Sequence, residues 1–286
     1  MMNPLVLYHD NCPDGFTAAW AVWKALGDDV EYRAVNYGQS PPLGAATGRR
    51  VILVDFSYPR ALLDQLADIA ASVEVYDHHK TAQADLADWV RGRVVFDMER
   101  SGAGIAWDEF HRGEPLAPRW RPTLVDYVED RDLWRWALPD SREVSEYVFS
   151  VERIFERWDE LAAMIETERG TVVGAGRALL RAKRVRVETI CKNVQWVTLG
   201  ACDYPRVNGV AIPVVNTAWD FSEIGEYLCE QFPDAPCGGY WFERADKTQW
   251  GFRSRGDFDV SALCRQYGGG GHRNAAGFTS EHGWRP

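Results

Sequence analysis

The sequence predicts an α/β fold, in which an N-terminal parallel sheet flanked by helices is followed by a smaller C-terminal α+β domain. Three observations support this prediction. Short apolar runs alternate with helix-like segments over the first 100 residues. Acidic residues stand at or just past the ends of several of these runs. Beyond residue 195, strand-like runs dominate and helix-like segments become few.

The N-terminal strands are predicted at residues 5–8, 32–35, 51–54 and 73–76, where short runs of apolar and aromatic residues end in polar residues. Helix-like segments at residues 16–26 and 60–71 lie between them. Since strands separated by helices usually form βαβ units, this order predicts a parallel sheet with helices on both faces.

The middle of the chain is predicted to be helical at residues 101–110, 122–134 and much of 150–169. Residues 170–194 are rich in Arg and Lys and contain only one acid, Glu188. This stretch is either a solvated helix face or a basic connecting helix that faces a nucleotide cleft. We therefore expect an N-terminal domain over residues 1–175, a linker helix over 176–196 and a C-terminal domain over 197–286.

The C-terminal domain is predicted to contain strands at residues 194–199, 210–216, 239–243 and 249–254. Helices are expected at residues 223–231 and 260–267. This mixture indicates a small α+β unit.

Composition excludes some classes of function. The formal net charge of −10 argues against a protein that coats long DNA, because such binding depends on many Lys and Arg contacts to phosphate. A small nucleotide bound through a divalent metal remains compatible with it. The six cysteines form no C-x-x-C pair, and no secretory signal or apolar run of about 18 residues is seen. We expect a cytoplasmic protein with reduced thiols and no membrane segment.

Acidic residues mark one edge of the predicted sheet. Asp14, Asp55 and Asp77 each lie at or just past the C-terminal end of a strand, where open α/β sheets bind ligands. His78 and His79 follow Asp77 directly. Carboxylates and imidazoles are good ligands for Mn²⁺, Mg²⁺ or Zn²⁺, so a metal site is predicted here.

A run of four glycines, Gly268 to Gly271, precedes His272 near the C-terminal end of the sequence. Backbone amides in such a loop can form an anion-binding concavity, and His272 can donate to a phosphate. We expect a helix to begin near Asn274 and to add its N-terminal dipole. Three arginines are candidates for clamping phosphate: Arg253, Arg255 and Arg273.

These motifs together resemble the DHH phosphoesterase superfamily. Residues 8–15 (YHDNCPDG) resemble its first motif, 54–57 (VDFS) its second, Asp77-His78-His79 its third, and 130–134 (DRDLW) its fourth. The segment GGGGHRNAAG resembles the signature of the family's associated C-terminal domain. The resemblance covers nearly the whole chain in the right order, and members with this layout include RecJ-type exonucleases, nanoRNA and pAp phosphatases, and cyclic-dinucleotide phosphodiesterases.

The resemblance implies a centre with two divalent ions, with Mn²⁺ expected first and Mg²⁺, Zn²⁺ or Fe²⁺ as alternatives. It implies that Asp55 bridges the ions and that Asp14, His78 and Asp130 complete one site. Asp130 is preferred to Asp126 and Asp132 because it has the family's Asp-x-x-x-aromatic spacing to Trp134. The resemblance further implies catalysis by His79, Asp55 and Asp77, and substrate binding by Gly269, Gly270, Gly271 and His272. Arg253 and Arg273 are added to the substrate-binding residues because a guanidinium group suits bidentate contact with phosphate.

The first motif departs from the family pattern. The family usually supplies two aspartates separated by one residue, and here Cys12 stands at the earlier position, before Asp14. Cys12 is either a thiolate ligand, which would favour Zn²⁺ or Fe²⁺, or a small buried residue. We favour the second alternative, with His9 or Asp10 binding the metal instead.

The expected function is hydrolysis of phosphate esters in short oligonucleotides or small nucleotides by metal-activated water. One alternative is an exonuclease on longer single strands, with the basic stretch as its track and exposed tryptophans as stacking surfaces. Another is a catalytically impaired nucleotide sensor, an idea motivated by Cys12.

Family members are often homodimers, so a dimer is possible here. The GGGGH segment speaks against a pyrophosphatase, since the family's pyrophosphatases carry a different C-terminal domain.

Overall fold

The computed structural model describes residues 2–10, 12–112, 121–199 and 209–286. The chain divides into two compact units, Met1–Leu180 and Arg181–Pro286. The division falls within the long helix α9 (Arg169–Ile190). Cys202 lies outside the described residues.

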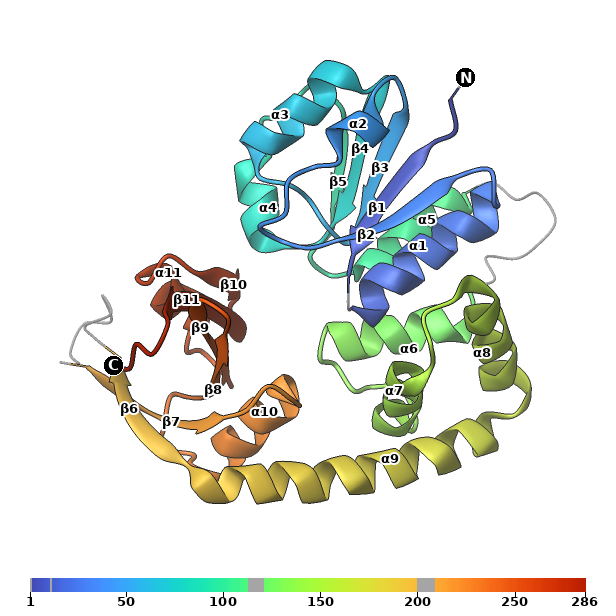
Figure 1. Cartoon of the computed structure of the whole chain (residues 1–286). Helices are drawn as coiled ribbons and strands as arrows, with labels where there is room; N and C mark the ends of the chain where they lie inside the picture. Colours follow the sequence, from blue (N-terminus) through green and yellow to red (C-terminus); the bar gives the residue numbers. More distant parts are fainter. Residues whose placement is uncertain (1, 11, 113–120, 200–208) are drawn as a thin grey trace. The chain divides into compact units, whose positions relative to one another are not determined.

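Unit 1 contains a five-stranded sheet in the order β2-β1-β3-β4-β5, in which every pair of neighbours is parallel (Figure 1). This confirms the predicted α/β class with a parallel sheet, to which the structure adds the edge strand β5. The strands are β1 (Leu5–His9), β2 (Glu31–Val35), β3 (Arg50–Val54), β4 (Ser72–Asp77) and β5 (Arg93–Phe96).

The central strands β1 and β3 are largely buried on both faces of the sheet, which explains why they are continuous apolar runs, whereas the edge strands β2 and β5 are more exposed. On one face, Val6, Ile52 and Tyr76 pack against a core that includes α1 (Pro13–Leu26) and α5 (Gly102–Phe110). On the other face, alternate strand residues such as Leu53 pack against α3 and the segments around it. The other helices are α2 (Leu43–Ala46), α3 (Arg60–Ile69), α4 (Lys80–Asp85), α6 (Thr123–Asp132), α7 (Ser141–Ser150) and α8 (Phe155–Thr167).

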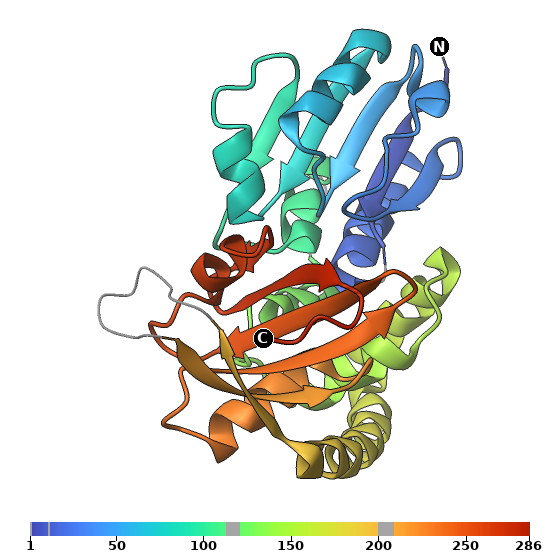
Figure 2. The same ribbon diagram turned by 60° about the vertical axis from the view of Figure 1, so that its left-hand side comes forward.

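Unit 2 is built on a six-stranded sheet in the order β10-β11-β9-β8-β7-β6, visible as the orange and red arrows in Figure 2. Only the pair β7 and β8 is parallel among its described strand pairs. The elements are η1 (Cys191–Asn193), β6 (Gln195–Leu199), β7 (Val210–Asn216), α10 (Phe221–Gln231), β8 (Cys237–Arg244), β9 (Lys247–Ser254), α11 (Val260–Arg265), β10 (Gly270–His272) and β11 (Ala275–Glu281).

The helix expected to begin near Asn274 is absent from the described residues, and that prediction was wrong. Ala275 begins β11 instead, which pairs with β9 on one side and β10 on the other. The reason is that alternate side chains of this segment are buried, as in a strand: Ala276 and Phe278 pack in the core with Trp250. The last two glycines of the run, Gly270 and Gly271, therefore lie in β10, which is one arm of a β-hairpin.

Large aromatic residues fill the cores of both units. Trp20 and Trp158 are fully buried in unit 1, and Trp250 is fully buried in unit 2. Over the part of the chain that the structure describes, no helix is both long and apolar enough to cross a membrane.

Candidate metal centre

Three neighbouring parallel strands deliver acidic side chains to one edge of the unit 1 sheet. Asp55 directly follows β3, Asp77 ends β4, and Asp14 lies in the first turn of α1, which follows β1. All three carboxylates are buried, as is His78. Buried charges require partners, and this edge gathers more carboxylates than cations.

Three groups of side chains place donor atoms within 4.8 Å of one another. We call them the aspartate cluster (Asp14, His78, Asp132), the histidine cluster (Asp55, His78, His79) and the cysteine cluster (His9, Cys12, Asp55). Asp55 and His78 each belong to two clusters, so the three form one continuous centre.

The Nε2 atom of His78 lies at the middle of the aspartate cluster. It is 3.2 Å from Asp55 Oδ1, 3.4 Å from Asp132 Oδ2 and 3.7 Å from Asp14 Oδ2. Burial opposes a charged imidazole here, but the hydrogen bond to Asp55 and the charge of Asp132 outweigh it and raise the pKa of His78 to about 10. The site therefore favours positive charge at its centre.

Asp14 is held by the N-terminus of α5. The backbone N–H groups of Gly102 and Ala103 donate to its two carboxylate oxygens at 2.7 and 3.0 Å. These amides and the helix dipole favour a carboxylate. Burial, followed by the charges of Asp55 and Asp132, nevertheless raises the pKa of Asp14 well above its usual range. A bound cation would offset this repulsion.

Gly102 allows the close approach of α5 to the centre. A Cβ atom at this position would lie 2.4 Å from the Cβ of Asp55, which is closer than side-chain carbons pack. The preceding Ser101 caps α5 by accepting from Gly104 N, and Ser101 N donates to Glu129 at 3.1 Å. The requirement for glycine at 102 thus comes from the metal centre.

Asp55 occupies a left-handed backbone conformation with φ 53°, an uncommon one for a residue other than glycine. Such strain is typical of functional positions. Burial acts to raise the pKa of Asp55, but its interactions with His78 and His9 dominate and lower it. Asp55 therefore stays ionised, which is the protonation state that a metal ligand needs.

Asp77 supports His79. Its Oδ1 atom accepts from Nδ1 of His79 at 2.6 Å and from the backbone N–H of His78 at 2.7 Å. A carboxylate in this position fixes the orientation of the imidazole ring. Asp77 belongs to none of the three clusters, so its role in this geometry is to orient the ring of His79.

The structure brings Asp132, and not the predicted Asp130, to the metal centre. The Asp130 carboxylate instead accepts from the backbone N–H groups of Ala137 and Leu138 and from the hydroxyl of Ser141. Both aspartates lie at the end of α6, where a two-residue step changes the direction of a side chain by about half a turn. Only Asp132 therefore points towards His78.

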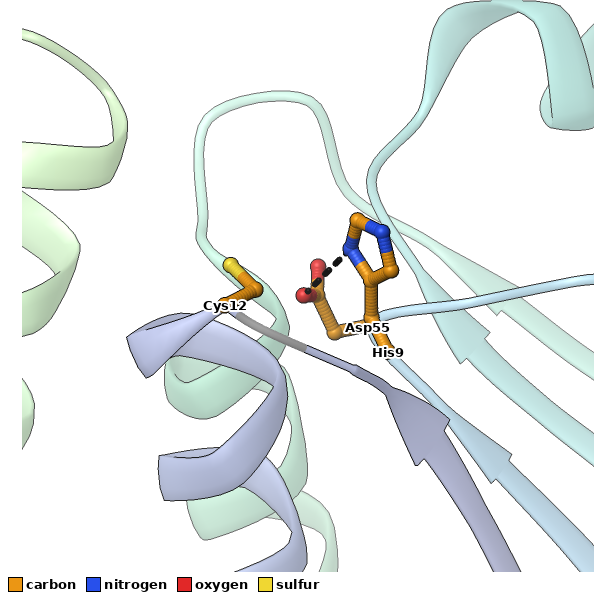
Figure 3. A group of neighbouring side chains, drawn as sticks. All are labelled: His9, Cys12 and Asp55. Carbon is orange, nitrogen blue, oxygen red and sulfur yellow. Dashed lines mark ion pairs between the residues drawn. The ribbon is translucent and has the colours of Figure 1, made fainter. Parts of the chain in front are cut away.

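The polar atoms of the cysteine cluster have fewer hydrogen-bond partners than those of the rest of the centre (Figure 3). His9 Nδ1 and Asp55 Oδ2 lie 3.6 Å apart, and neither atom has a hydrogen-bond partner although both are buried. Cys12 immediately precedes α1. Burial, followed by the charges of Asp55 and Asp132, raises the pKa of the Cys12 thiol well above its usual range. Unpaired imidazole and carboxylate atoms beside a thiol are a donor set that suits a divalent ion.

Asp10 lies outside the three clusters. Its carboxylate accepts from the side-chain amide of Asn36 at 3.1 Å, and its backbone N–H donates to Val35. The position beside Cys12 that the sequence left open between His9 and Asp10 is thus taken by His9.

Besides Asp132, two contributions to this site were not predicted from the sequence. Tyr37 lies beside it, with its ring centroid 5.3 Å from that of His9 and 5.8 Å from that of His79. No sequence signal marks this tyrosine. The start of α5 was detectable, because Ser101 followed by Gly-Ala-Gly is a typical N-terminal cap, but its contact with Asp14 depends on the tertiary fold.

The residues predicted to bind substrate lie in unit 2, around the hairpin of β10 and β11. Gly271 has φ 139°, and a Cβ on Gly269 would lie 2.1 Å from the carbonyl oxygen of Gly277, so hairpin packing already requires both glycines. Arg253 donates to Ser222, and Arg273 donates to Asp257. His272 is exposed. A Cβ added to Gly270 would meet no other atom within 4 Å, so packing does not require a glycine there.

The sequence was compared with protein families and with known proteins. No family model matches the chain. The uncharacterized protein R106 of Acanthamoeba polyphaga mimivirus is 28% identical over 291 residues, which cover 96% of this chain and 66% of that protein. The chain thus spans just under two thirds of the length of this relative.

Solved structures resemble the whole chain at low identity. The DHH domain of a member of the s1p family of ribosomal proteins has a TM-score of 0.57 at 14% identity, covering 98% of this chain and 83% of that one. RecJ from Thermus thermophilus in complex with Mn²⁺ has a TM-score of 0.53 at 14% identity, covering 97% and 49%. The pGpG-specific phosphodiesterase PggH from Vibrio cholerae has a TM-score of 0.50 at 12% identity, covering 98% and 93%. The chain therefore has the fold of the DHH-domain proteins.

Proposed function

We propose that this protein is a metal-dependent phosphoesterase that hydrolyses phosphate esters of short oligonucleotides or small nucleotides. One observation carries the proposal: the aspartate and histidine clusters meet at His78, at the sheet edge where α/β proteins bind ligands. The DHH-type fold supports it, since a solved structure with this fold is named as a phosphodiesterase and another contains Mn²⁺.

In this proposal, Asp14, His78 and Asp132 hold one divalent ion, with Mn²⁺ as the first candidate, and Asp55 is shared with a second ion. The pair of ions, when bound, supplies Lewis acidity that activates a water and neutralises charge on the phosphate. The chain supplies orientation. Asp14 is fixed by the amides of α5, and Asp55 is fixed by a strained backbone.

His79 is proposed to contact the substrate phosphate. Its Nδ1 is engaged by Asp77, so Nε2 is the ring nitrogen proposed to donate to a non-bridging phosphate oxygen. Asp77 itself does not contact the substrate in this scheme and acts by holding the ring. His272 and the hairpin glycines are proposed to bind a terminal phosphate, with Arg253 and Arg273 as the accompanying cations.

Short substrates are preferred over long ones for two reasons. The net charge of −10 opposes binding of a long polyanion. The basic residues of α9 are largely paired with acids, since Lys183 contacts Glu223 and Arg186 contacts Asp220. This pairing supports the solvated-face interpretation and weakens the idea of a basic track. A cytoplasmic location and a homodimer remain predictions.

The test combines a substrate series with metal removal. We expect purified protein with Mn²⁺ to hydrolyse 5′-phosphorylated dinucleotides faster than long single strands, and to lose activity after treatment with a chelator. At a metal concentration of about 100 Kd, bound ion should stabilise the protein by about 2.7 kcal/mol, which a thermal melt would detect.

Three outcomes would count against the proposal. Equal rates on dinucleotides and long strands would support the exonuclease alternative. Tight nucleotide binding without turnover in any of Mn²⁺, Mg²⁺, Zn²⁺ or Fe²⁺ would support the sensor. Undiminished hydrolysis after complete metal removal would exclude the metal mechanism.

A further inference from the structure

We infer that the second metal position of this protein is a mixed His–Cys–Asp site in which the Cys12 thiolate binds the ion, so that the two metal positions differ in chemistry. The inference deepens the proposed function by naming the ligands and metal class of one position. It departs from the expectation that Cys12 is only a small buried residue.

Three side chains from separate segments of the chain converge at this position. The donor atoms of His9, Cys12 and Asp55 all lie within 4.8 Å of one another, although they come from the end of β1, the residue before α1 and the end of β3. Figure 3 shows the sulfur, the carboxylate and the imidazole on the same side of the sheet edge. Two ligands of one tetrahedral ion lie roughly 3.5 Å apart, as follows from metal–ligand bonds of about 2.0–2.3 Å.

Two buried atoms of the cysteine cluster lack hydrogen-bond partners. Asp55 is 1% exposed, and its Oδ2 atom has no hydrogen-bond partner. His9 Nδ1 lies 3.6 Å from this oxygen and also lacks a hydrogen bond. Leaving a buried carboxylate oxygen without a partner is costly, and an ion between these atoms removes that cost.

The two carboxylate oxygens of Asp55 have different surroundings. Oδ1 lies 3.2 Å from His78 and belongs to the well-paired side of the centre. Oδ2 faces His9. One carboxylate thus presents each oxygen to a different ligand set, which is the arrangement that a bridging ligand needs.

The ligand types determine which metal this position selects. The aspartate cluster offers two carboxylates and one imidazole, which suit Mn²⁺ and Mg²⁺. The cysteine cluster offers one thiolate, one imidazole and one carboxylate, which suit Zn²⁺, Co²⁺ or Fe²⁺. On binding, the thiol releases its proton to solvent and the sulfur donates an electron pair to the ion. We therefore expect the two positions to fill with different metals when both kinds are offered.

The test uses Co²⁺ as a spectroscopic probe on the whole chain in the presence of a non-thiol reductant. A thiolate bound to Co²⁺ gives an intense charge-transfer absorption in the near ultraviolet, which carboxylate and imidazole ligands do not produce. We expect the parent protein to show this band. Cys12→Ser should lose it while still binding Co²⁺ at the aspartate cluster.

Two further variants make the test decisive. Cys191→Ser removes a half-buried thiol of unit 2 and should keep the full band, since it is not part of the cluster. Cys12→Asp restores an oxygen ligand and should bind two ions without the band, with its preference shifted from Zn²⁺ towards Mn²⁺. Circular dichroism reports whether each variant is folded.

The inference is overturned if Cys12→Ser keeps the band, or if the folded parent binds two Co²⁺ ions without it. These readouts do not depend on turnover. A parent protein that shows the band but hydrolyses no phosphate ester would therefore refute the proposed function and leave the metal assignment standing.

Discussion

The aspartate cluster and the cysteine cluster share one centre but are held in opposite ways. In the aspartate cluster, Asp14 is fixed by two backbone amides of α5, and His78 contacts three carboxylates. In the cysteine cluster, the Nδ1 atom of His9 and the Oδ2 atom of Asp55 lack hydrogen-bond partners. Protein groups thus organise the first cluster without an ion, whereas in the proposed scheme a bound ion would organise the second. Four sets of variants test this difference, and the largest effect is expected where the clusters meet.

Asp55→Ala should abolish most activity, because it removes the carboxylate shared by the cysteine and histidine clusters. Loss of an outer-shell partner of a metal ligand typically costs 10–100-fold, so loss of this ligand should cost more than about 100-fold in kcat/KM. Steady-state hydrolysis of a dinucleotide in Mn²⁺ measures this. Activity close to that of the parent protein would show that the centre is not the catalytic site.

Asp132→Ala and Asp130→Ala form a matched pair on the same helix. Asp132→Ala should lower Mn²⁺ affinity strongly, again by more than about 100-fold, with little loss of fold stability. Asp130→Ala leaves the amides of Ala137 and Leu138 unpaired, so it should reduce the free energy of unfolding by about 2 kcal/mol and leave metal affinity nearly unchanged.

Metal titration and urea unfolding of both proteins separate these effects. If Asp130→Ala loses the metal while Asp132→Ala retains it, the spacing to Trp134 was the better guide and the geometry of α6 is misassigned.

Gly102→Ala should weaken the aspartate cluster indirectly, because the added Cβ would meet Asp55 at 2.4 Å and push α5 away. We expect Mn²⁺ affinity to fall about 10–100-fold, the effect typical of an outer-shell change. Gly174→Ala is the matched control, since nothing lies within 4 Å of its Cβ position in α9. It should be neutral or stabilising by up to about 1 kcal/mol. Equal effects of the two substitutions would contradict the close-packing argument.

His272→Ala should have the smallest effect, because it removes a proposed phosphate contact and no metal ligand. Losing one charge-assisted hydrogen bond corresponds to an increase of KM by about 10-fold, with kcat nearly preserved. His282→Ala is the control, as this exposed histidine of unit 2 is paired with Glu243. A large fall in kcat for His272→Ala, or an equal effect of His282→Ala, would remove the proposed role of the hairpin.

The parallel sheet and the position of its functional edge could be predicted from the sequence. Apolar runs between helical segments predict where the strands lie. Because the carboxyl ends of parallel strands meet at one edge of the sheet, the polar residues that follow them are expected there. Asp14, Asp55 and His78 were found this way. The hairpin of β10 and β11 was not, because a glycine run followed by Ala-Ala-Gly fits a loop before a helix as well as a strand, and only pairing with β9 separates the two.

The sequence by itself determined the fold class and the residue types at the centre. Local periodicity and strand ends are properties of short segments, so they can be predicted without knowledge of the tertiary contacts. Tertiary structure alone decided between Asp130 and Asp132, and between His9 and Asp10 as the neighbour of Cys12. Each pair is one or two residues apart, so sequence position hardly separates its members. The direction in which a side chain leaves a helix or strand end depends on what packs around it, and that is fixed only when distant segments meet.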